Sequence, residues 1–200
     1  MLEACRRHVD SGFMPKRVLD FGCGVGRVSI PLAERSDTVV GVDISPAMLE
    51  EADRNARAEG KNNLRWVLSD DQLSGVEGQF DLVHSCITFQ HIDIPRGRRL
   101  FGSLISMISP GGVGAIQITY AKIHHLDTFG QPPERQSRAL ARSLIAPAEP
   151  LGDPEMQMNA YHLGELAFIL QQSGIEQFHS RFTDHGGELG VFLFFGKPRK

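Results

Sequence analysis

A short apolar segment that runs directly into glycines limits the fold of this chain more than any other feature. Residues 17–21 read RVLDF, and glycines follow at positions 22, 24 and 26. Apolar residues at helical spacing then run from Val28 to Ala33. This order predicts a buried strand, a tight turn and a helix, because glycine accepts the backbone conformations that such a turn needs.

The strand-and-helix pattern repeats along the chain. Residues 38–42 (TVVGV) predict a second buried strand, and Ser45 and Pro46 predict the start of a helix, as N-cap and first-turn proline. Strands are also expected at 64–68, 80–87 and 113–119, and a helix at 96–108. Strands that alternate with helices predict a parallel sheet covered on both faces.

The C-terminal part departs from this alternation. Residues 121–160 are irregular and contain prolines, so we expect an insertion that acts as a lid, with one helix at 134–145. A helix at 161–173 and two strands at 175–182 and 190–196 come next, the strands forming a hairpin. The prediction is therefore one α/β domain over 1–200, an open sheet of about seven mostly parallel strands with an antiparallel C-terminal hairpin.

Composition excludes several classes of partner. The net charge is −3 and the pI about 6.2, so no basic field favours nucleic acid. The longest apolar runs, such as Gly190 to Phe195, are too short to cross a membrane. Three cysteines without metal-ligand spacing suit a reducing compartment, and we expect a cytoplasmic protein without a metal site.

The glycine loop and two aspartates indicate a ligand site. Glycines let a ligand lie on the backbone beside a helix N-terminus, but Arg27 stands where a dinucleotide fingerprint has its third glycine. Asp20, just before the loop, would oppose a pyrophosphate and suits an ammonium or sulfonium group. Asp43, at the end of the second strand, can accept both hydroxyls of a ribose, as in folds that bind NAD.

From Val18 to Thr119 the sequence resembles the class I S-adenosylmethionine-dependent methyltransferases. The matching segments occur in the order of that family: 18–26, 42–45, 80–92 and 108–112. The resemblance implies a Rossmann-like fold, S-adenosylmethionine as cofactor, and an acidic residue after the third strand near the adenine. The implied cofactor-binding residues are Asp20, Gly22, Gly24, Gly26, Asp43, Ile44, Asp70, Asp71 and Ser85.

Other residues carry two interpretations. The resemblance places His91 at the pocket rim beyond the fourth strand, where an imidazole could act as general base, although a single histidine is often structural. His84 is expected to be buried within its strand, and Met48 to pack in a helix core. Two arginine clusters would favour an anionic acceptor if they line the active-site mouth: Arg96, Arg98 and Arg99, and Arg135, Arg138 and Arg142.

The expected function is transfer of a methyl group from S-adenosylmethionine to oxygen or nitrogen of a small molecule. Two alternatives are an NAD-dependent oxidoreductase, disfavoured by Arg27, and an inactive module that binds S-adenosylmethionine. For the oligomeric state, the sequence leaves a homodimer open. Before the first strand only residues 2–9 predict a helix, which is short for this family. The sequence identifies neither the acceptor nor the need for a base.

Overall fold

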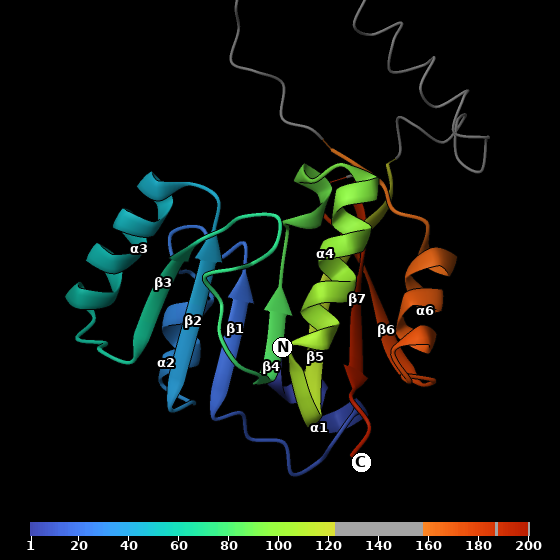
Figure 1. Ribbon diagram of the computed structural model, residues 1–200, viewed down its shortest axis with the longest axis horizontal. Coiled ribbons are helices and arrows are strands. Elements are labelled where there is room, and N and C mark those ends of the chain that lie inside the picture. The colour runs from blue at the N-terminus through green and yellow to red at the C-terminus, as the bar shows by residue number, and fades with distance from the viewer. Residues whose placement is uncertain (123–157, 187, 200) are drawn as a thin grey trace, which may run out of the picture.

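The described part of the chain forms one open, seven-stranded sheet (Figure 1). The structure is a computed structural model that describes residues 1–122, 158–186 and 188–199. Along the sheet the strands lie in the order β3-β2-β1-β4-β5-β7-β6. Their bounds are Arg17–Phe21 (β1), Thr38–Asp43 (β2), Leu64–Leu68 (β3), Phe80–Ser85 (β4), Ile108–Lys122 (β5), Phe178–Asp184 (β6) and Glu188–Gly196 (β7).

Six strands run in the same direction, and β7 alone of the described strands runs against them. β1 pairs in parallel with β2 and β4, β2 with β3, and β4 with β5. β7 is antiparallel to both β5 and β6, as a hairpin at the end of the chain requires. The carboxyl ends of β1 to β5 therefore lie at one edge of the sheet, where open α/β sheets bind their ligands.

Helices cover both faces of this sheet (Figure 1). α1 and α2 contribute Cys5 and Leu32 to one apolar cluster, whereas α4 and α6 contribute Leu104 and Leu166 to the other. α3 packs against β2 and β3. The helix bounds are Leu2–His8 (α1), Ser29–Ala33 (α2), Pro46–Ala58 (α3), Ile94–Ser106 (α4) and Leu163–Gln172 (α6), with a 3-10 turn at Phe89–His91 (η1).

Burial on both faces explains why the central strands are apolar without alternation. Val18 and Leu19 are adjacent in β1 and point to opposite faces, yet both are completely buried. Val18 packs in the cluster of α1 and α2, and Leu19 in the cluster of α4 and α6. The predicted fold class is therefore confirmed.

Some predicted boundaries are wrong. β5 extends over 108–122 and β6 begins at Phe178, three residues later than expected. The strand expected to reach Ile87 ends at Ser85, because Ile87 has a φ of 56° that no extended strand accommodates. The helix expected at 134–145 and nearly all of the expected lid lie outside the described residues. Among the described helices, none is both long and apolar enough to span a bilayer.

Candidate functional site

The loop after β1 adopts a conformation that depends on glycine. Gly22, Gly24 and Gly26 have φ values of 73°, 52° and 84°, in the left-handed region that side chains disfavour. The Gly22 amide donates a hydrogen bond of 2.7 Å to the carbonyl of Val42, in β2. The loop is thereby attached to the neighbouring strand at the carboxyl edge of the sheet.

Two of these glycines have different surroundings. A Cβ at Gly22 would lie 2.1 Å from Thr88 Oγ1, so this position packs against the turn after β4. A Cβ at Gly24 would meet no atom of the described residues within 4 Å. Gly24 therefore borders open space, and a ligand can approach its backbone there.

Asp43 links the glycine loop to the end of β2. Its Oδ2 accepts a hydrogen bond of 2.9 Å from the Gly24 amide, and its Oδ1 accepts one of 2.9 Å from the Ser45 amide. The residue is half-buried. Because an ionised carboxylate can accept about four hydrogen bonds, Asp43 retains capacity for the hydroxyls of a ligand.

Apolar side chains lie exposed near this carboxylate. Ile44 directly succeeds Asp43 and is 64% exposed, and Met48, in the first turn of α3, is 45% exposed. The prediction that Met48 packs in the helix core is wrong. Ala52 and Ala56 occupy the buried face of α3, and Met48 continues that face beyond the packed region. Exposed apolar surface beside an acceptor of hydroxyl groups suits the ring and ribose of a nucleoside.

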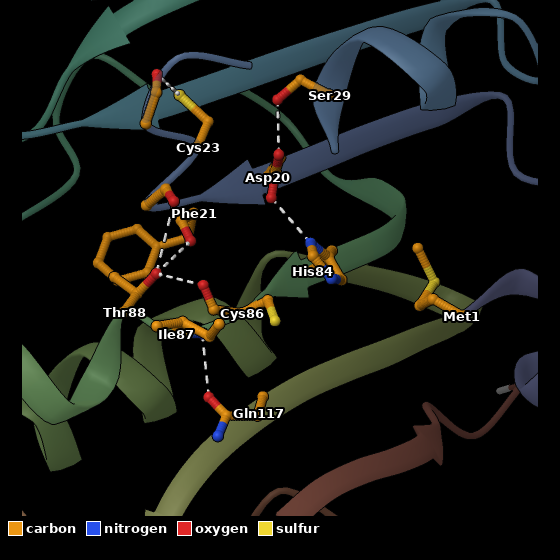
Figure 2. Close-up of polar contacts among 12 residues, drawn as sticks. Met1, Asp20, Phe21, Cys23, Ser29, His84, Cys86, Ile87, Thr88 and Gln117 are labelled. Carbon is orange, nitrogen blue, oxygen red and sulfur yellow. Dashed lines mark hydrogen bonds and ion pairs between the residues drawn. The ribbon is translucent and has the colours of Figure 1, made fainter. Parts of the chain in front are cut away.

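Asp20 is held inside the protein between two partners (Figure 2). Its Oδ2 accepts a hydrogen bond of 2.5 Å from Ser29 Oγ, and its Oδ1 lies 2.8 Å from Nδ1 of His84. Asp20 and His84 are each 2% exposed, which confirms that His84 is buried. An ionised carboxylate only accepts, so Nδ1 of His84 carries the proton of this contact.

The turn after β4 is strained and held from several sides. Ile87 is branched at Cβ and has a φ of 56°, a conformation that such residues seldom adopt. Its amide donates 2.9 Å to Oε1 of the buried Gln117 in β5 (Figure 2). Ser85 is completely buried and its Oγ has no hydrogen-bond partner within the described part of the chain. Strain and an unsatisfied hydroxyl of this kind concentrate at functional sites.

Asp70 and Asp71 come after β3, as predicted, and both side chains have partners. Asp70 accepts hydrogen bonds from the amides of Gln72 and Ser74 at 3.1 and 2.9 Å. Hydrogen bonds from Ser74 lower the pKa of the Asp70 carboxyl. Asp71 forms an ion pair of 2.6 Å with Arg96 of α4. Both carboxylates therefore organise the segment after β3, and their role toward an adenine stays a prediction.

His91 ends the 3-10 turn η1 and is exposed. Its Nε2 lies 3.4 Å from the side-chain nitrogen Nε2 of Gln90. The side-chain oxygen Oε1 of Gln90 in turn accepts a hydrogen bond of 2.8 Å from the hydroxyl of Thr119. Two residues near the end of the expected lid hold the same turn. Tyr161 donates 2.8 Å to the carbonyl of Ile92, and the Asn159 amide donates 2.6 Å to the carbonyl of Gln90. The candidate base therefore lies on a fixed support.

The described part of the chain supports neither a cysteine nucleophile nor a metal site. Burial raises the pKa of the thiols of Cys23 and Cys86, which keeps both in the weakly nucleophilic neutral form. No three His, Cys, Asp or Glu side chains in that part of the chain are arranged to hold a metal ion.

Comparison with known proteins finds similarity to methyltransferases. Residues 18–112, which contain the glycine loop, Asp43 and the turn after β4, match the family model described as a methyltransferase domain. The trans-aconitate 2-methyltransferase of Streptomyces coelicolor is 34% identical over 132 residues, 64% of this chain and 41% of that protein. These matches support the class I S-adenosylmethionine-dependent methyltransferases as the family of this chain. The chain spans less than half the length of that relative.

Further members of the methyltransferase family show the same similarity. The trans-aconitate 2-methyltransferase of Methylobacterium radiotolerans is 34% identical over 143 residues, 70% of this chain and 49% of that protein. Magnesium protoporphyrin IX methyltransferase from Synechocystis, with bound S-adenosylhomocysteine, superposes with a TM-score of 0.71 over 94% of this chain and 77% of that one. At 20% identity that structure supports the methyltransferase fold alone.

Sequence reasoning located the edge of the candidate site and missed part of the structure that supports it. The structure brings Gly24, Asp43 and Ile44 together at the carboxyl edge of the sheet, and their role toward a cofactor stays a prediction. It was not predicted that His84 contacts Asp20, although both residues lie near the ends of parallel strands that neighbour each other in this fold. The contributions of Gln117 and Tyr161 leave no signal in the sequence, because they depend on contacts between distant segments.

Proposed function

We propose that this chain binds S-adenosylmethionine at the carboxyl edge of the sheet and transfers its methyl group to a small-molecule acceptor. The observation that carries the proposal is the arrangement of Asp43, Gly24 and Ile44. Asp43 accepts the Gly24 amide, Gly24 borders open space, and Ile44 is exposed beside the carboxylate. The ribose hydroxyls would bind Asp43, the adenine would pack on Ile44, and the methionine part would cross the glycine loop.

The reaction needs little from the protein beyond positioning. A lone pair of the acceptor attacks the methyl carbon, the carbon–sulfur bond breaks, and the sulfur keeps its electron pair as the thioether of S-adenosylhomocysteine. A hydroxyl acceptor must also release its proton, and His91 on the turn η1 is the candidate base. A carboxylate or a neutral amine attacks with a lone pair that is already available.

A carboxylate is the acceptor that the relatives favour. Two relatives methylate trans-aconitate by name, a third is named for aklanonic acid, and both compounds are organic acids. The arginine cluster at the start of α4 supports an anionic acceptor less than the sequence suggested, because Arg96 forms an ion pair with Asp71 and Arg98 forms one with Glu165. An anionic acceptor therefore rests on the relatives rather than on free cations at that helix.

An assay of methyl transfer tests the proposal. The purified protein is incubated with S-adenosylmethionine labelled in the methyl group and, separately, with trans-aconitate, other small carboxylic acids, phenols and amines. The proposal predicts label in at least one product. At a subsaturating concentration of S-adenosylmethionine, labelling should be much slower with Asp43→Ala, which lacks the ribose acceptor. Label in no product, despite binding of S-adenosylmethionine, would instead favour the inactive binding module.

A further inference from the structure

We propose that His84 is a positioning residue that holds the Asp20 carboxylate and, through it, the glycine loop in the form that binds the cofactor. The inference rests on the proposed function, since it concerns affinity for S-adenosylmethionine and its product. It assigns Asp20 an indirect part in binding. The carboxylate faces the protein interior and both of its oxygens have partners there (Figure 2).

The sheet itself brings Asp20 and His84 together. β1 and β4 are adjacent and parallel, and their register places Asp20 directly beside His84. Neighbouring positions on parallel strands point to the same face, so the two side chains meet under the carboxyl edge. A buried carboxylate without a partner carries a large desolvation cost, and the imidazole N–H offsets it.

Asp20 connects the two ends of the glycine loop. It is the penultimate residue of β1, two residues before Gly22, and its second partner, Ser29, is the first residue of α2. Ser29 Oγ donates to Oδ2 while the imidazole of His84 donates to Oδ1. The same carboxylate thus fixes the start and the end of the loop, whose middle Asp43 holds at the Gly24 amide.

The orientation of His84 is set by its surroundings. The imidazole lies against the ring of Phe192 in β7, with centroids 6.5 Å apart and planes inclined by 24°. Nδ1 is the ring nitrogen directed at Asp20. Substitution can therefore test the geometry of the donor: the amide nitrogen of asparagine can occupy a place close to Nδ1, whereas that of glutamine reaches the place of Nε2.

The loop conformation links this contact to ligand affinity. Its three glycines adopt left-handed backbone conformations, and the loop must keep them in order to leave Gly24 open. A loop that is fixed before binding loses less conformational entropy when the ligand arrives. Loss of the His84 contact frees the carboxylate to turn, releases Ser29, and leaves the ligand to order the loop.

Calorimetric titration with S-adenosylhomocysteine tests the inference. His84→Gln should weaken binding by about tenfold or more, and His84→Asn should remain within about threefold of wild type, because it restores the donor at Nδ1. Ser29→Ala, which removes only a hydroxyl, should weaken binding by about threefold to tenfold. Thermal unfolding of each variant measures stability separately from affinity. A purely structural role of His84 predicts that the variants lose stability while their affinity for the ligand stays unchanged.

The outcomes distinguish the inference from the proposed function. Wild-type protein that fails to bind S-adenosylhomocysteine contradicts the proposed function itself. Wild-type protein that binds, together with His84→Gln and Ser29→Ala variants of unchanged affinity, contradicts the role of His84 alone. Equal weakening by His84→Asn and His84→Gln also contradicts it, because the donor position would then not matter. If the glutamine variant does not fold, Ser29→Ala and His84→Asn still decide the question.

Discussion

The Gly24 amide donates a hydrogen bond of 2.9 Å to Oδ2 of Asp43, so the loop after β1 and the acidic end of β2 form one unit. The bond crosses between adjacent parallel strands at the edge of the sheet. Any change to either residue therefore alters both the loop and the acceptor that the ribose would use. Substitutions at Asp43 and at Gly24 separate these effects.

Replacing Asp43 by alanine should weaken S-adenosylhomocysteine binding by roughly 1.5–3 kcal/mol, the scale for hydrogen bonds to a charged group. Titration calorimetry measures the change. A ligand analogue without the ribose hydroxyls should already bind the wild-type protein weakly. The Asp43→Ala substitution should then reduce the affinity for this analogue little further. Asp53→Ala, which removes an exposed partner of Arg57 on α3, is the control and should bind normally. If the loss of affinity from the Asp43→Ala substitution and the loss from removing the ribose hydroxyls were fully additive, the ribose would bind away from Asp43.

Replacing Gly24 by valine should abolish S-adenosylhomocysteine binding while the protein stays folded. The branched side chain would fill the open space beside the loop. Gly60→Val is a matched control. Gly60 also has a positive φ, of 66°, and a Cβ there would have no neighbour within 4 Å in the described part of the chain, but Gly60 lies after α3, away from the site. Both variants should lose about 1–2 kcal/mol of stability from backbone strain. Comparable ligand affinity in the two would refute the loop assignment.

Replacing His91 by alanine distinguishes the classes of acceptor. For a hydroxyl acceptor, turnover should fall by ~10²–10⁴-fold with cofactor affinity nearly unchanged, the usual size of a general-base effect. For a carboxylate, which the relatives favour, the loss should be far smaller, because no proton has to leave. Steady-state rates with the acceptor found in the methyl-transfer assay measure this. A large loss with a carboxylate would require a positioning role for His91 instead.

Alkaline pH should destabilise the protein through a thiol far from the site. Burial raises the pKa of Cys5 from 9.0 to about 11. The unfolded chain then releases this proton at lower pH than the folded chain, so stability falls as pH rises. From pH 9 to 11 the free energy of unfolding should drop by about 2–3 kcal/mol through Cys5. Urea unfolding of wild type and Cys5→Ala should show a flatter pH dependence for the variant.

The positions of residues at strand ends could be predicted from the sequence. Asp43 and the glycines could be placed together, because parallel strands bring their carboxyl ends to one edge whatever the packing beneath. The expected lid over 121–160, the homodimer and the cytoplasmic location stay predictions.

Contacts that depend on the exact register between strands could not be predicted from the sequence. The partnership of Asp20 with His84 requires knowing that β1 neighbours β4 in a register that sets these two residues side by side. The left-handed Ile87 contradicts the local preference of a β-branched residue, and the buried Gln117, thirty residues further along the chain, holds its amide. Tertiary structure overrides local preference there, as is common at functional sites.

Calorimetric titration of the wild-type protein with S-adenosylhomocysteine and, separately, with NADH tests the central claim most directly. Both ligands carry an adenosine whose ribose could bind Asp43, and they differ in the group that must cross the glycine loop. The pyrophosphate of NADH would meet a loop with Arg27 in place of the third glycine. We predict saturable binding of S-adenosylhomocysteine and none of NADH. Binding of NADH without binding of S-adenosylhomocysteine would contradict the claim.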